Sequence, residues 1–146
     1  FYKILFAEKI TLDYRAYLAL KEAEGGDAIV QDAFLVISQK ELADLLLKHE
    51  YFISKYPNSK LLKGVNSRYK SLQKTYLLGI DNSPVIDDSK GLLYAKAKKE
   101  FQRFVEAYPK SPTSKLVNVI LAEKQIDYST LYNKIEQLQN QFLYWL

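Results

Sequence analysis

Two stretches of the chain share the sequence Tyr-Pro-x-Ser, and this repeat constrains the fold more than any other feature. They are "KYPNSKLLKGV", residues 55–65, and "AYPKSPTSKLV", residues 107–117, which align at an offset of 52 residues. In each copy a Phe stands four residues before the Tyr. Because Pro disfavours helical geometry in the residue before it, and Ser caps helices, each copy predicts a corner between two helices. Repeating one corner makes successive helices pack at similar angles, which predicts a helical stack.

The composition agrees with an all-α fold in one domain. A length of 146 residues is typical of a single domain, so residues 1–146 are assigned to one. Five Gly and four Pro are too few for a protein made of strands and tight turns. We therefore expect five to six antiparallel helices.

Apolar spacing predicts the helices of the first half. Residues 2–23 follow the 3.6-residue period, although the opening "FYKILF" also suits a short strand. Asp27 is expected to cap a further helical pattern, which runs from Ala28 through residue 37. Ser38 and Glu41 then have the spacing of a capping box, which marks either a new helix or a bend in a long one. Pro57 ends this segment.

The second half continues the pattern. A helix over residues 59–79 is expected to stop at Gly79, and the polar residues 80–89 to form a loop. The next helix is marked by five apolar residues, and Ser111 with Pro112 opens another. These five are Leu93, Ala97, Phe101, Phe104 and Tyr108.

The last helix, residues 128–145, is expected to be capped by Asp127. Its apolar residues lie at alternating steps of four and three: Leu131, Ile135, Leu138, Phe142 and Trp145. This apolar seam must pack back onto earlier helices or onto a partner.

The chain resembles the tetratricopeptide repeat family. The second half of that family's pattern, Ala-x3-Phe with Pro eight residues after the Phe, is present as Ala97, Phe101 and Pro109. The earlier copy has Leu45 and His49 in these places. The resemblance covers about residues 39–124 and implies helix pairs stacked into an α-solenoid, a right-handed superhelix.

The chain also departs from the family pattern. Its repeat is 52 residues long rather than about 34, and the excess falls within residues 59–89. The family's Trp-x2-Leu-Gly-x2-Tyr motif is not recognisable in "SKLLKGVNSRYK". A non-repeating helical bundle is the alternative fold.

The Tyr-Pro-x-Ser corner is similar to that of bacterial cell-envelope members, such as outer-membrane assembly lipoproteins and Tol–Pal-associated proteins. This likeness implies a non-enzymatic adaptor that holds a protein or peptide on the periplasmic side. Upstream of Phe1 is where an export signal or lipid anchor would lie. The residues themselves leave a cytoplasmic location open, and no apolar run approaches the roughly 20 residues that span a bilayer.

No catalytic, cofactor or metal site is predicted, and the chain is not expected to be an enzyme. It has no Cys, no phosphate-binding glycine loop and no nucleophile elbow. His49 is either a catalytic base or metal ligand, or a half-buried ring in the place of Phe101, and the second interpretation is favoured. Asp87 and Asp88 are either an acid–base pair or weak cation site, or charges at a helix N-terminus, and again the second interpretation is favoured.

The charge distribution indicates where a partner binds. Residues 52–115 carry thirteen Lys or Arg against five Asp or Glu, whereas residues 1–51 carry six against nine. If the helices that carry the basic side chains are neighbours, these form one positive strip; otherwise they are solvated faces. The alternative function is nucleic-acid or other polyanion binding. The predicted partner-binding residues are Lys63, Lys70, Lys74, Tyr94, Lys96, Lys99 and Arg103.

Overall fold

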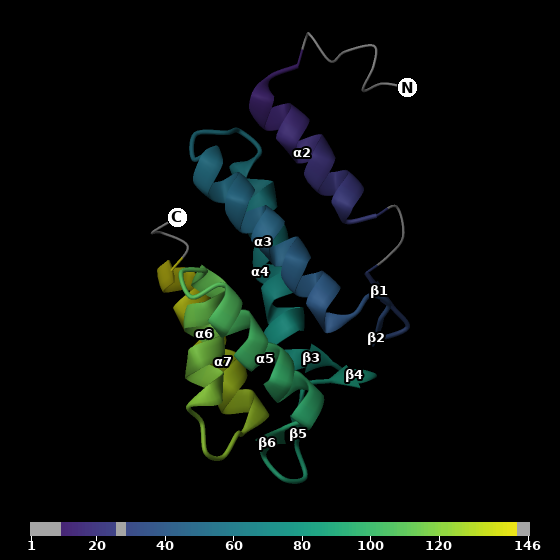
Figure 1. The fold of residues 1–146 in the computed structure, drawn as a ribbon, viewed down its shortest axis with the longest axis vertical. Coiled ribbons are helices and arrows are strands. Elements are labelled where there is room, and N and C mark those ends of the chain that lie inside the picture. The colour runs from purple at the N-terminus through teal and green to yellow at the C-terminus, as the bar shows by residue number, and fades with distance from the viewer. Residues whose placement is uncertain (1–9, 26–28, 143–146) are drawn as a thin grey trace.

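The computed structural model describes residues 10–25 and 29–142 and is predominantly helical, as predicted (Figure 1). The part of the chain that it describes contains six helices. They are α2 (Leu12–Ala23), α3 (Gln39–Lys55), α4 (Leu62–Leu78), α5 (Ala95–Ala107), α6 (Pro112–Leu121) and α7 (Tyr128–Phe142).

The prediction of helix over residues 28–37 is wrong within the part described. Val30–Gln31 (β1) and Phe34–Leu35 (β2) pair as an antiparallel hairpin instead. Asp32 and Ala33 form its turn with φ angles of 49° and 60°, the left-handed geometry of a type I′ turn. Val30 and Phe34 suit strands, and hydrogen bonds to Asn82 and Ser83 hold the hairpin, so tertiary contacts overrode the helical spacing.

The expected loop at residues 80–89 also contains short strands. Gly79–Ile80 (β3) pairs with Ser83–Pro84 (β4), and Ile86–Asp87 (β5) pairs with Leu92–Leu93 (β6). Leu93 therefore lies before α5 rather than in it. Asp87 lies in a strand, so its assignment to a helix N-terminus is wrong.

The helix boundaries agree with most of the capping predictions. Ser38 and Glu41 form the capping box that begins α3 as a new helix. Asp127 accepts a bond from the Thr130 N–H at the start of α7, at 2.8 Å. Gly79 ends α4 with φ of 75°. The expected cap at Asp27 lies outside the described residues.

The two Tyr-Pro segments form the same corner. Tyr56 ends α3 with φ, ψ of −126°, 58°, and Tyr108 ends α5 with −131°, 57°. Each Tyr ring lies against the Phe one turn earlier, with centroids 5.2 Å apart for Phe52 and 5.3 Å apart for Phe104. The repeat therefore encodes a repeated structure.

The serines of the two corners differ in one respect. Ser111 is the N-cap of α6, as predicted, but α4 begins later, with Leu61 as its N-cap, so Ser59 does not cap it. Both hydroxyls nevertheless accept a bond from the N–H two residues on, Leu61 at 3.2 Å and Thr113 at 3.1 Å. The local turn is thus the same.

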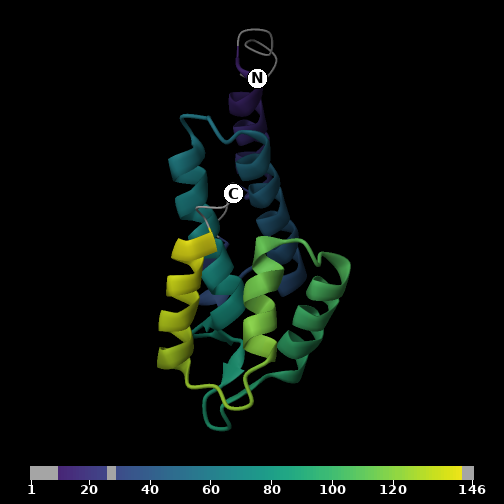
Figure 2. The ribbon, with the colours of Figure 1, turned by 90° about the vertical axis from the view of Figure 1, so that its left-hand side faces the viewer.

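The helices pack in a regular order. α3 packs against α4, and α5 against α6; between these pairs, α3 contacts α5 and α4 contacts α6. α2 lies on α3, on the side away from α6 and α7 (Figure 1). α7 packs on α4 and α6, and Figure 2 shows α6 between α5 and α7. The described part of the α7 seam thus packs back onto its own chain, with Leu131 and Ile135 buried.

Aromatic side chains tie the two helix pairs together. The ring of Tyr76 on α4 is buried, and its centroid lies 5.4 Å from the ring centroid of Phe101 and 5.6 Å from that of Phe104, both on α5. Burying one such ring contributes about 1.5–3 kcal/mol. Tyr69 is also buried, whereas Tyr56 and Tyr108 are half-buried against the core.

Candidate functional site

A groove lies where the hairpins meet the start of α5, and it contains two of the predicted partner-binding residues. Its volume is about 470 Å³, and Tyr94 and Lys96 both line it. The other lining residues come from four parts of the chain: Leu35, Ile37, Ser38, Gln39, Thr75, Ile80, Ser83, Pro84, Val85 and Ala97. We call it the hairpin groove.

Three hydrogen bonds join the β1–β2 hairpin to the β3–β4 hairpin. The Asn82 N–H donates to the Ala33 carbonyl at 3.0 Å, and the Asn82 side chain donates to the Asp32 carbonyl at 2.9 Å. The Leu35 N–H donates to Ser83 Oγ at 3.0 Å. Two adjacent non-glycine residues in left-handed geometry are costly, so these bonds hold a strained turn in the hairpin that carries the lining residue Leu35.

The start of α5 is fixed to the same hairpins. Tyr94 is the N-cap residue of α5. Its N–H donates to the carbonyl of Val85, the residue after β4, at 3.0 Å. Its side chain is 44% exposed, and Lys96 is exposed one position into the helix. Both side chains are therefore available to a partner.

Among the described residues that line the hairpin groove, Lys96 is the only charged one. Apart from its ammonium, the lining is aliphatic, aromatic or neutral polar. Phe34 and Val36 alternate with the lining residues Leu35 and Ile37, so they lie on the other face of this segment, where they are 55% and 56% exposed. The groove itself therefore offers mainly apolar and neutral polar surface with one positive charge.

The other predicted residues meet different parts of the fold. Lys70 donates to Asn140 at 2.9 Å, and Lys74 pairs with Glu136 at 2.8 Å, so both face α7. Lys74 also lies over the Tyr132 ring, 4.7 Å from its centroid. These two lysines help to hold α7 on α4.

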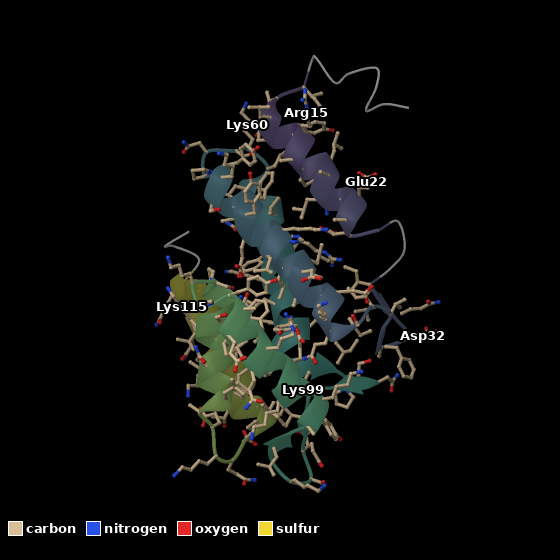
Figure 3. All side chains as sticks on the ribbon, in the orientation of Figure 1. Arg15, Glu22, Asp32, Lys60, Lys99 and Lys115 are labelled. Atoms are coloured by element: carbon tan, nitrogen blue, oxygen red, sulfur yellow. The ribbon has the colours of Figure 1, made fainter. Side chains whose placement is uncertain are left out.

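On α5, Arg103 pairs with Glu100 at 2.6 Å, and these bonds raise the pKa of the guanidinium. Lys99 is exposed on α5, toward the same end of the molecule as Asp32 in Figure 3, and Lys63 is exposed on α4. Of the seven predicted residues, the structure brings Tyr94 and Lys96 into one groove.

The sequence interpretation missed a buried polar network centred on Glu50 of α3. Glu50 Oε1 accepts bonds from the hydroxyls of Tyr69 at 2.7 Å, Ser111 at 2.9 Å and Thr113 at 2.7 Å. Gln73 donates to both Tyr69 and Thr113, at 2.9 and 2.8 Å. Burial, and then the Glu50 charge, raise the pKa of Tyr69 well above its ordinary value.

The network ends on α7, where Gln139 donates to Gln73 Oε1 at 2.8 Å and to the Lys70 carbonyl at 3.0 Å. It therefore joins α3, α4, α6 and α7 through polar side chains at core-facing positions. The sequence held one signal for this network. Gln73 follows Tyr69 by four residues and Gln139 follows Ile135 by four, a spacing that places each glutamine on the same helix face as an apolar residue of the predicted core.

His49 is buried, more deeply than the half-buried ring expected, and its surroundings were also missed. Its Nδ1 lies 2.9 Å from the Leu45 carbonyl, which only accepts, so Nδ1 carries the proton. Its Nε2 lies 3.2 Å from Glu24 Oε1 at the end of α2. Burial lowers the pKa of His49, against the raising effects of the Leu45 carbonyl and Glu24.

Within residues 10–25 and 29–142, no group of three or more His, Asp or Glu side chains is placed to hold a metal ion. None of the helices described is both long and apolar enough to cross a bilayer. No protein-family model, curated protein or solved structure matches the chain.

Proposed function

We propose that this protein is a non-enzymatic adaptor that binds an apolar segment of a protein partner in the hairpin groove. The observation that carries the proposal is a groove of about 470 Å³ with a single charge, that of Lys96. Concave, mainly apolar sites with a few placed polar groups are typical of ligand recognition. A carboxylate in the partner segment would pair with Lys96, and apolar side chains would fill the remainder.

The lining supports binding rather than catalysis. Its described residues include no Asp, Glu, His or Cys, so they supply neither a carboxylate or imidazole base nor a usual metal ligand. Tyr94 suits an interface because its ring buries apolar area while its hydroxyl stays hydrated.

We further propose that the fold is a short tetratricopeptide-like stack. Three features support this: the repeated corner, the packing of α3 with α5, and the packing of α4 with α6. α7 does not extend the series, because it lies on α4 and α6. By the same resemblance we propose a place in a bacterial cell-envelope complex.

Selection from a random peptide display library tests the proposal. Peptides that combine apolar residues with Asp or Glu should be enriched on the wild type. Lys96→Glu should weaken their binding by about tenfold or more, because it replaces attraction by repulsion at a partly desolvated site.

Lys63→Glu is the matched control, since it makes the same charge change on α4 outside the groove. It should leave binding nearly unchanged. Equal loss in both variants, or no acidic–apolar enrichment, would overturn the groove assignment. Retention of single-stranded DNA that falls steeply with salt would favour polyanion binding instead.

A further inference from the structure

A second groove lies between α3 and the corner that joins α5 to α6, and it shares no lining residue with the hairpin groove. Its volume is about 530 Å³. Its walls include Tyr51 and Tyr108, and Glu50 lines it as well. Tyr51 is 61% exposed, whereas Glu50 is only 9% exposed. We call it the corner groove.

The two carboxylate oxygens of Glu50 have different surroundings. Every hydrogen bond described for Glu50 ends on Oε1: those from Tyr69, Ser111 and Thr113. Among the described residues, no hydrogen bond is found for Glu50 Oε2, and this atom is not one of the fully buried side-chain atoms that lack a partner. Because Glu50 lines the corner groove, Oε2 is the carboxylate oxygen left to accept a bond from a ligand there.

The charge of Glu50 has no cationic partner in the part of the chain described. None of the ion pairs found there involves Glu50. Hydroxyl donors and the start of α6 stabilise Oε1, which fixes the carboxylate in place. Oε2 is thus a hydrogen-bond acceptor on a carboxylate whose position is already fixed, in a groove with aromatic walls.

We propose that the corner groove binds a basic side chain, arginine or lysine, presented by a protein partner. The cation would pair with Glu50 Oε2, and the rings of Tyr51 and Tyr108 would lie against its aliphatic stem or its charge. The groove is large enough for the neighbouring residues of the partner to enter as well. Lys110, an exposed residue that also lines the groove, opposes this binding by repulsion.

The test is an NMR titration of the isotope-labelled full chain with blocked single amino acids. N-acetyl-arginine methylamide and the lysine equivalent are the probes, and the norleucine equivalent is the uncharged control. Saturable shifts of the Tyr51 and Ser111 amides are expected with the two cations and not with norleucine. Glu50→Gln keeps an acceptor for Oε1 bonds and should weaken binding by about tenfold.

Two surface variants make the test independent of the buried network. Tyr51→Ala should weaken the cationic probes severalfold, and Lys110→Ala should strengthen them, because it removes a repelling charge. Lys115→Ala, on α6, is the charge-matched control and should have little effect. Equal shifts with norleucine, no shift at the groove, or unchanged binding in both Tyr51→Ala and Lys110→Ala would overturn the proposal.

Discussion

The Ser111 hydroxyl donates a hydrogen bond of 2.9 Å to Oε1 of Glu50, which links the α5–α6 corner to α3. The equivalent hydroxyl of the first corner, Ser59, donates to Oδ2 of Asp13 on α2 at 2.5 Å. Each corner serine is therefore bonded to a carboxylate of a neighbouring helix. The repeated corner thus fixes the chain locally and also attaches it to a helix that comes earlier in the chain.

Replacing Ser111 by Ala is expected to cost more stability than replacing Ser59. Ser111 caps α6 and donates to a buried carboxylate, so Ser111→Ala should lower the free energy of unfolding by about 1–3 kcal/mol. Ser59 caps no helix, and its loss should be smaller. Urea unfolding of both variants measures the difference, and equal losses would contradict the distinction.

Ser59→Ala is also expected to raise the pKa of Asp13. The bond from Ser59 is the largest cause of the lowered pKa of that carboxyl in the folded protein. Because the pKa of Asp13 is lower in the folded chain than in the unfolded chain, where it is near 3.8, the ionised carboxylate stabilises the fold at pH values above 3.8. This stabilisation is lost as the pH falls through the folded pKa. A carbon-detected NMR titration of Asp13 should show the upward shift in Ser59→Ala and none in Ser54→Ala.

His49 is expected to make the protein less stable in mild acid. Burial lowers its folded pKa below the ordinary value near 6.5, although Glu24 opposes this, so the unfolded chain binds the proton more tightly. Stability should fall as pH drops through about 6.5 toward the folded pKa. Glu24 faces the ring from the end of α2, and Lys21 and Arg68 are each paired with Glu24.

His49→Phe, the residue of the second repeat, should remove this dependence. Urea unfolding of both proteins between pH 5 and 8 (roughly the range that His titrates) checks it. An unchanged pH slope in the variant would assign the dependence to other groups.

Two glycines should respond oppositely to Ala. Gly64 lies inside α4 with nothing within 4 Å of an added Cβ, so Gly64→Ala should stabilise the protein by about 0.5–1 kcal/mol. At Gly79, φ is 75°, and a Cβ would lie 2.6 Å from the Val85 nitrogen, so Gly79→Ala should be destabilising. Thermal unfolding of both variants measures the two changes in stability, and a change in the same direction for both would contradict this prediction.

Ala33→Gly is expected to stabilise the first hairpin. The φ of 60° at Ala33 strains a residue that has a Cβ, and Gly removes this strain. Gly also raises the conformational entropy of the unfolded chain, but the loss of strain should be the larger effect, with a net gain in stability of about 0.5–1 kcal/mol. Ala122, the C-cap of α6, has φ of −80°, so Ala122→Gly offers no relief and should be slightly destabilising. Hydrogen exchange of the Val36 amide, bonded to the Ile29 carbonyl, reports on the hairpin; faster exchange in Ala33→Gly would contradict the strain argument.

The sequence predicted the features that depend on neighbouring residues. The capping box at Ser38, the corner at Tyr108 and the stop at Gly79 each need a few adjacent side chains, so they could be identified by spacing. The hairpin at residues 30–35 was mistaken for helix, because its two-residue turn uses Asp32 and Ala33 rather than glycine.

The candidate site was predicted only in part. Tyr94 and Lys96 were singled out, but as members of a strip shared with Lys70 and Lys74, which instead bond to α7. Which side of α4 a lysine faces depends on the helix that packs there, and spacing within one helix carries no such information.

By itself, the sequence determined that the chain forms helices, where most of them end, and that one corner is made twice, because capping, proline sterics and helical period act over a few residues. The tertiary structure alone decided that Glu50 meets Ser111 and Thr113, that His49 meets Glu24, and that Lys96 borders a groove. These pairings join residues distant in sequence, and they exist only because packing of the apolar faces brings the helices together at fixed angles.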